Sequence, residues 1–152
     1  MNYQLDTQEL NLKTDNNNFI TITTPGEIQQ TFIADQDKLS GIKIFLSNFG
    51  KSVRNSNYTL VLYQKDCLSI ITTVVLPNTT IDSSYYRAYF PEIKNSNNHT
   101  YCLSITPPAK SAFDPLAIQL SKPNIYNQGM LTIRGDPSQQ DIVFAPLYDI
   151  HK

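Results

Sequence analysis

Apolar residues recur at every second position in many short runs of this sequence, and Pro, Gly and Asn separate the runs. Ile42, Ile44 and Leu46 form one such run, and Tyr101–Ile105 contains another. A period of two places the apolar side chains of an extended strand on one face, whereas a helix needs a stripe at every third or fourth residue. The runs therefore predict an all-β chain, folded as an antiparallel β-sandwich of eight or nine strands.

The 152 residues fit one domain, which we expect at 19–152. Residues 1–18 are then an N-terminal arm that is either loose or an edge strand. The candidate strands are Phe19–Thr23, Ile28–Ala34, Ile42–Leu46, Leu60–Leu62, Ile70–Leu76, Tyr85–Phe90, Tyr101–Ile105, Leu116–Leu120, Met130–Ile133 and Ile142–Phe144. Their apolar parity predicts a core that contains Phe32, Ile44, Leu62, Phe90, Leu103 and Phe144.

The charge balance argues against nucleic acid as a partner. The chain has 12 Lys and Arg against 13 Asp and Glu, a net charge of −1, and phosphate binding needs a basic face. We find no basic, apolar leader and no apolar run long enough to span a membrane, so direct membrane insertion is not expected. The location stays open: the sequence fits a soluble domain, including one from a longer envelope-associated protein.

Residues for catalysis are scarce. The two histidines are His99, in an Asn-rich loop, and His151, next to the last residue. The sequence also contains no G-x-S-x-G nucleophile motif, no phosphate-binding P-loop and no G-x-G-x-x-G dinucleotide-binding motif. We therefore expect two surface histidines and a protein that is not an enzyme.

The two cysteines, Cys67 and Cys102, fit neither a disulfide framework nor a paired metal motif. We favour two free thiols, with a bridge between them as the alternative.

A tyrosine- and arginine-rich strand is the strongest candidate for a binding site. Alternation places Tyr85, Arg87 and Tyr89 on the face opposite Ala88 and Phe90. Two phenol rings beside a guanidinium can stack on sugar rings and donate to their hydroxyl groups. The alternative is ordinary cross-strand packing, in which the arginine stacks between the tyrosines. Among the other tyrosines, Tyr126 is added to the predicted site.

Two acidic residues form the only metal hypothesis. Glu27 and Asp141 precede the expected first and last main strands, whose ends can meet in a sandwich. Their carboxylates would then suit a structural Ca²⁺. The alternative is a pair of solvated acids at strand ends, and no other cofactor is predicted.

The order of several segments resembles a known family. Gln30–Ala34 (QTFIA), Leu39–Ile42 (LSGI), Asp82–Ile93 and Gln140–Phe144 (QDIVF) follow one another as in bacterial jelly-roll-like β-sandwich domains. Those domains accompany membrane glycosyltransferases and other cell-surface polysaccharide proteins. The last segment departs from the family pattern because Gly does not precede Asp141.

The resemblance implies a jelly-roll-like, carbohydrate-binding-like accessory domain without catalytic activity. Together with the tyrosine and arginine strand, it predicts weak binding of an oligo- or polysaccharide. The alternative is a structural or protein-interaction domain of a cell-surface or secreted assembly, for which a protein partner is expected. A hydrolase is the weakest of the three hypotheses.

Overall fold

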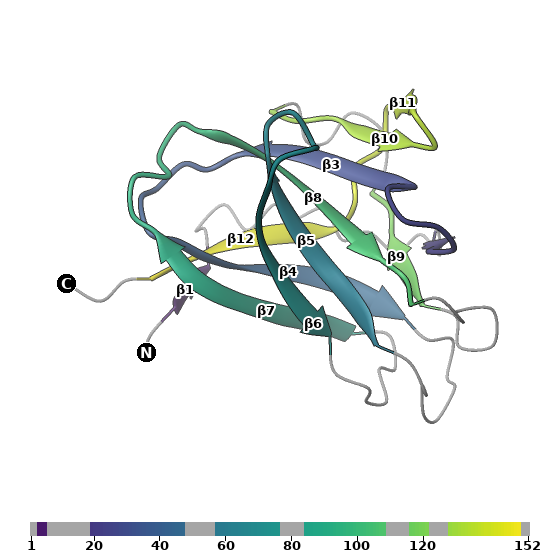
Figure 1. The fold of residues 1–152 in the computed structure, drawn as a ribbon, viewed down its shortest axis with the longest axis horizontal. Coiled ribbons are helices and arrows are strands. Elements are labelled where there is room, and N and C mark those ends of the chain that lie inside the picture. Colours follow the sequence, from purple (N-terminus) through teal and green to yellow (C-terminus); the bar gives the residue numbers. More distant parts are fainter. Residues whose placement is uncertain are drawn as a thin grey trace.

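The computed structural model describes Tyr3–Leu5 and residues 19–47, 57–76, 84–108, 116–121 and 128–149. Within these residues the chain forms strands and no helix, and every strand pair is antiparallel. The strands make two sheets that pack against each other (Figure 1). The predicted all-β sandwich is therefore confirmed.

The first sheet is built around β4. In spatial order it contains β1 (Tyr3–Leu5), β12 (Phe144–Asp149), β4 (Leu39–Ser47), β9 (Ala117–Gln119) and β2 (Phe19–Thr21), and β7 (Ser84–Ile93) also pairs with β4. Every residue of β4 is buried. A strand with both faces covered tends to be apolar throughout, and Ile42–Leu46 is apolar except for the buried Lys43.

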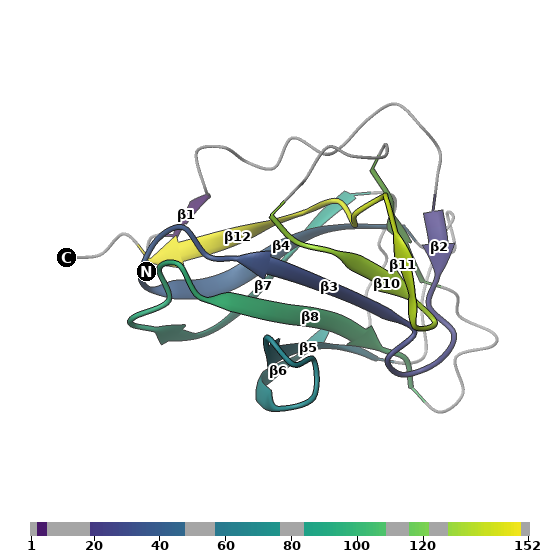
Figure 2. The same cartoon turned by 90° about the horizontal axis from the view of Figure 1, so that it is seen from above.

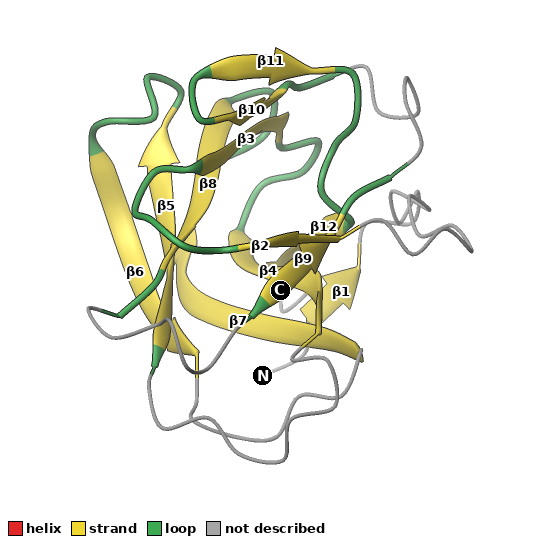
Figure 3. Ribbon diagram, turned by 90° about the vertical axis from the view of Figure 1, so that its right-hand side faces the viewer, coloured by secondary structure: helices red, strands yellow, loops and turns green. Residues whose placement is uncertain are grey.

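The second sheet contains, in spatial order, β11 (Asp136–Ser138), β10 (Leu131–Ile133), β3 (Ile28–Ile33), β8 (Thr100–Thr106), β5 (Tyr58–Gln64) and β6 (Ile70–Leu76). Figure 2 gives the view from above. In the end view of Figure 3, β3, β8, β5 and β6 form one wall and β4, β7 and β12 the other. Several connections, including those from β3 to β4 and from β7 to β8, pass from one sheet to the other.

The prediction of eight or nine strands is wrong, because the described residues form twelve. Two strands have no counterpart among the candidates: β1, which lies within the predicted N-terminal arm, and β11, and each is only three residues long. One of them, β11, contains Pro137, which suits an edge strand because proline donates no ladder hydrogen bond. The last strand was also misplaced: it begins at Phe144, where it was expected to end, and it runs through Pro146.

The core lies between the sheets and contains the six predicted residues. Phe32, Ile44, Leu62, Phe90, Leu103 and Phe144 are all buried. Phe32 contacts Tyr101 and Phe144, with ring centroids 5.9 Å and 5.5 Å apart. No helix in the described ranges is long and apolar enough to cross a membrane.

Candidate functional site

The predicted tyrosine and arginine stripe lies on β7, but its members differ in exposure. Tyr85 and Arg87 stand opposite Phe45 and Lys43 of β4. The Tyr85 ring packs edge-on against Phe45, with centroids 5.0 Å apart, and the Lys43 ammonium lies 4.3 Å from its centre. Tyr85 is half-buried as a result, while Arg87 and Tyr89 are exposed. The described stripe is therefore partly packing and partly open surface.

Gly41 allows the Tyr89 ring to lie across β4. A Cβ atom at Gly41 would stand 3.2 Å from Cδ1 of Tyr89 and 2.7 Å from the carbonyl oxygen of Ala88. Any larger residue would therefore push β7 away from β4 or displace the ring. Tyr89 keeps 44% of its surface exposed in this position.

Tyr126, the fourth predicted member of this site, lies outside the described residues.

Glu27 is buried and is held by its own loop and by an arginine. Its Oε1 accepts hydrogen bonds from the backbone N–H and the hydroxyl of Thr23, at 3.0 and 2.7 Å, and its Oε2 lies 2.7 Å from Arg134. Arg134 and Gly135 form the two-residue β10–β11 turn, where both φ angles are positive, 52° and 85°. This turn type matches the twist of a hairpin and brings the guanidinium over Glu27.

Asp141 has different partners from Glu27. The side-chain amide of Gln30 donates to its Oδ1 at 2.9 Å. Among the described residues, no group of three or more His, Cys, Asp and Glu is placed to hold a metal ion. The calcium hypothesis thus rests on the positions of Glu27 and Asp141 in the sequence alone.

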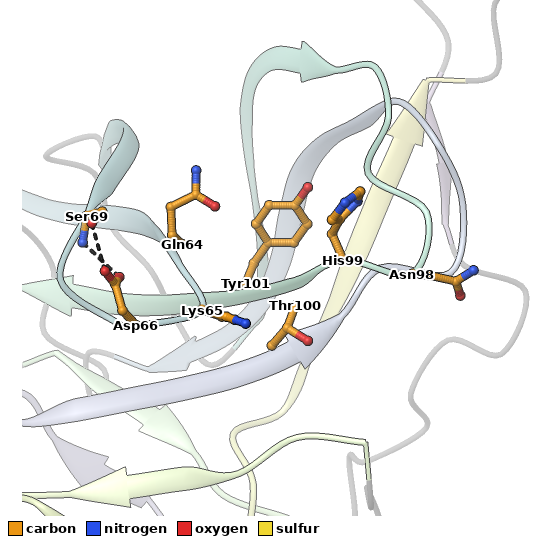
Figure 4. Close-up of a pocket in the computed structure, with 8 residues that line it drawn as sticks. All are labelled: Gln64, Lys65, Asp66, Ser69, Asn98, His99, Thr100 and Tyr101. Carbon is orange, nitrogen blue, oxygen red and sulfur yellow. Dashed lines mark hydrogen bonds between the residues drawn. The ribbon is translucent and has the colours of Figure 1, made fainter.

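A pocket that sequence analysis did not predict opens where the β5–β6 hairpin meets the start of β8 (Figure 4). Its volume is about 460 Å³, within the range of small-molecule sites. Gln64 and Tyr101 stand opposite each other across the β5–β8 ladder, and Tyr101 closes the inner wall of the pocket. The complete lining is Gln64, Lys65, Asp66, Ser69, Asn98, His99, Thr100 and Tyr101.

The hairpin wall of the pocket is shaped by Asp66. Its Oδ1 accepts hydrogen bonds from the backbone N–H groups of Leu68 and Ser69, both at 2.9 Å, and its Oδ2 accepts one from the Ser69 hydroxyl at 2.7 Å. The bonds from Ser69 and Leu68 hold the pKa of the Asp66 carboxyl below its usual value. An aspartate that bonds the backbone two and three residues ahead is typical of a tight turn.

The opposite wall follows the loop from β7 to β8. Asn98 has a φ of 65°, a left-handed conformation that asparagine tolerates better than most residues. The loop is fixed by buried Ser96, whose hydroxyl donates to the carbonyl of Gln36 at 2.6 Å and accepts from the N–H of Leu39 at 3.1 Å. These bonds position Asn98 and His99 at the pocket.

A disulfide joins Cys67 and Cys102, so the favoured interpretation of two free thiols is wrong. Cys67 follows Asp66 in the hairpin turn, and Cys102 follows Tyr101 on β8. The bridge therefore connects the two segments that line the pocket. The two cysteines are 35 residues apart in the sequence. They come together because β5 pairs with β8, which places the tip of the β5–β6 hairpin beside Cys102, and this strand pairing could not be predicted from the local sequence.

The pocket contains Ser, His and Asp side chains, but not in the arrangement of a catalytic triad. In a triad, serine donates to histidine and histidine donates to aspartate. Here the Ser69 hydroxyl donates directly to Asp66, and within the described residues His99 makes no side-chain hydrogen bond to either. The three side chains therefore line the pocket without forming a triad.

The pocket is not evident from the sequence, because each of its two halves resembles an ordinary surface segment. Lys65-Asp66 had the composition of a turn and His99 that of a polar loop. The sequence offers one signal of the pocket. Cys67 follows Asp66 and Cys102 follows Tyr101, so each cysteine is next to a residue of the pocket lining.

Comparison of the sequence with protein-family models gives no match, and comparison with curated proteins gives none either.

Proposed function

We propose that this chain is a non-catalytic carbohydrate-binding module and that the pocket between the β5–β6 hairpin and β8 is its ligand site. One observation carries the proposal. The side chains of Gln64, Lys65, Asn98 and His99 line the pocket but make no hydrogen bond or ion pair with the other described residues. Sugar hydroxyls both donate and accept, so mixed amide, hydroxyl and imidazole groups suit them.

The size of the pocket and its aromatic wall support the same proposal. A volume of about 460 Å³ lies within the range of small-molecule sites, about 300–1,000 Å³. Tyr101 forms a buried wall of the pocket, and only 5% of its surface is exposed, so a sugar can touch this ring over a small area only. Its rigid position against Phe32 limits the entropy lost when a ligand binds.

The exposed part of β7 is a second surface that this function can use. Arg87 and Tyr89 lie along a strand that leads into the loop of the pocket. A longer glycan could contact them after its end enters the pocket. Such open-face contacts bury little ligand area and are expected to be weak.

The disulfide favours a protein of an oxidising compartment. Disulfides persist in secreted, periplasmic and cell-surface proteins, whereas the cytosol reduces them. The Cys67–Cys102 bridge is therefore consistent with a module that meets glycans outside the cytoplasm.

A titration with simple sugars tests the proposal. Glucose, galactose and N-acetylglucosamine are added to the isotopically labelled chain, and NMR shifts of the pocket backbone are followed. We expect at least one sugar to shift residues 64–69 and 98–101 with a Kd of about 10⁻⁴ to 10⁻³ M. Gln64→Ala and His99→Ala should each weaken that binding about tenfold without changing Tm, since both side chains are exposed.

Gln29→Ala provides the matched control, because Gln29 lies on β3 outside the pocket and should leave affinity unchanged. Absence of shifts with every sugar, or shifts that the two pocket variants leave intact, would refute the proposal.

The alternative function, protein interaction, is favoured by one feature of β6. Among the described strands β6 pairs only with β5, and Leu68, Ile70 and Val75 are 79%, 62% and 59% exposed. Residues 68–76 carry no charge, so a second copy could pair with this edge without like-charge repulsion. Sedimentation equilibrium tests pairing between copies of this chain: a dimer that Val75→Lys converts to monomer would support pairing through β6, and a wild-type monomer would exclude it.

A further inference from the structure

The one carboxylate that lines the pocket already has partners. Asp66 accepts two backbone hydrogen bonds and one from Ser69, all within its own turn. A carboxylate has about four positions for accepting hydrogen bonds, and three are taken. Asp66 therefore has little capacity left for donors on a ligand.

The cationic and donor groups of the pocket have no such partners. Lys65 carries three N–H donors and no acceptor, and His99 has at least one ring N–H. Within the part of the chain that the structure describes, neither side chain makes an ion pair or hydrogen bond. The two come from the two opposite walls, Lys65 from the hairpin and His99 from the loop before β8, with Tyr101 between them (Figure 4).

A second acid, Asp37 of the β3–β4 loop, lies outside the pocket lining and bonds to the β7–β8 loop. Asp37 Oδ1 accepts a hydrogen bond from the N–H of Asn97 at 3.1 Å. Burial and then the charge of Asp37 raise the pKa of the Tyr101 hydroxyl, so that this phenol remains a hydrogen-bond donor. The unengaged groups of the pocket are thus mainly donors.

We infer that the pocket selects an acidic sugar, whose anionic group binds Lys65 and the neighbouring donors beside the wall that Tyr101 forms. This inference rests on the proposed function and adds the class of ligand. A charge-assisted hydrogen bond is about twice as strong as a neutral one. An anionic group should therefore raise affinity about tenfold over the neutral parent sugar.

Matched sugars test the inference. Calorimetric titrations at low salt compare glucose with glucuronate and glucose 6-phosphate, and galactose with galacturonate. We expect at least one acidic member of a set to bind about tenfold more tightly than its parent. A gain for the uronates identifies a carboxylate as the group recognised, and a gain for the phosphate alone identifies a phosphate.

Lys65→Gln should remove this gain and leave the affinity for the neutral parent within about twofold. Lys94→Gln is the matched control, because Lys94 lies on the β7–β8 loop outside the pocket lining and its loss changes net charge equally. The Lys94→Gln variant should keep the higher affinity for the acidic sugar.

Two kinds of outcome would overturn the inference, and only the second would also overturn the proposed function. If a neutral sugar binds but its acidic partners bind no more tightly, or if Lys94→Gln removes the gain as fully as Lys65→Gln, only the acidic preference fails. If no sugar of either kind binds, the proposed function fails with it.

Discussion

The buried side chain of Gln30 on β3 is hydrogen bonded to Asp141, on the segment that leads into β12. Its Nε2 donates to Asp141 Oδ1 at 2.9 Å, and its Oε1 accepts from the N–H of Ile142 at 3.0 Å. One glutamine thus connects the second sheet to the segment that enters the first. Both residues are almost inaccessible to water, so these bonds have no solvent substitute.

Gln30→Leu should therefore lower the free energy of unfolding by about 2–4 kcal/mol, because it leaves a buried carboxylate and a backbone N–H without these partners. Urea denaturation measures the change. Gln29→Leu, at the half-buried neighbouring position, should change stability by less than about 0.5 kcal/mol. Equal effects of the two substitutions would contradict the importance of this connection.

Loss of the disulfide should destabilise the fold. Closing a loop of 35 residues lowers the entropy of the unfolded chain, worth about 3–4 kcal/mol in the chain-entropy model. The variant Cys67→Ser/Cys102→Ala should lower stability by that order. Adding dithiothreitol should lower the Tm of the wild type and leave that of the double variant unchanged; a wild type indifferent to reductant would argue against the bridge.

Acidic pH should weaken the contribution of Glu27 to the stability of the fold. Burial by itself raises the pKa of this carboxyl, but hydrogen bonds from Thr23 and Thr24 and the charge of Arg134 outweigh it, so the pKa lies below the ordinary 4.5. A lowered folded-state pKa adds stability above pH 4.5 that disappears as pH falls through the folded-state value. Glu27→Gln should cost about 1–3 kcal/mol at pH 7, and the gap in Tm from wild type should narrow below pH 4.5. A gap that stays constant down to pH 3 would contradict this.

Substitutions in the β7 stripe should differ in their effect on stability, because Tyr85 packs against β4 and Arg87 is exposed. Tyr85→Ala removes contacts with Phe45 and Lys43 and should cost about 1–3 kcal/mol. Arg87→Ala, at an exposed position, should stay within about 0.5 kcal/mol. If β7 contributes to glycan binding, Arg87→Ala weakens binding of an oligosaccharide and leaves binding of a monosaccharide in the pocket unchanged. Equal losses for both ligands would place Arg87 in the pocket site.

Metal removal should leave stability unchanged. Arg134 already pairs with Glu27, and Gln30 with Asp141, so neither carboxylate needs a cation. Thermal denaturation with EDTA and with millimolar CaCl₂ should give the same Tm. A Tm raised by calcium and restored by EDTA would instead support the structural Ca²⁺ predicted from sequence.

Much of the fold could be predicted from the sequence, and little of the pocket. Phe32, Leu103 and the other core residues lie on the apolar parity of their runs, a local property that alternation reveals. The same alternation placed Arg87 and Tyr89 on an outer face but could not show that Tyr85 packs on Phe45. That contact depends on the register between β4 and β7.

The amino-acid sequence by itself determined the all-β class and the identity of the core, because both follow from residues two positions apart. The tertiary structure alone decided which polar groups meet. Gln30 and Asp141 are 111 residues apart and Cys67 and Cys102 are 35 apart, and nothing in either local sequence indicates its partner. Strand order and register bring such groups together, and they created the pocket by placing the β5–β6 hairpin beside the start of β8.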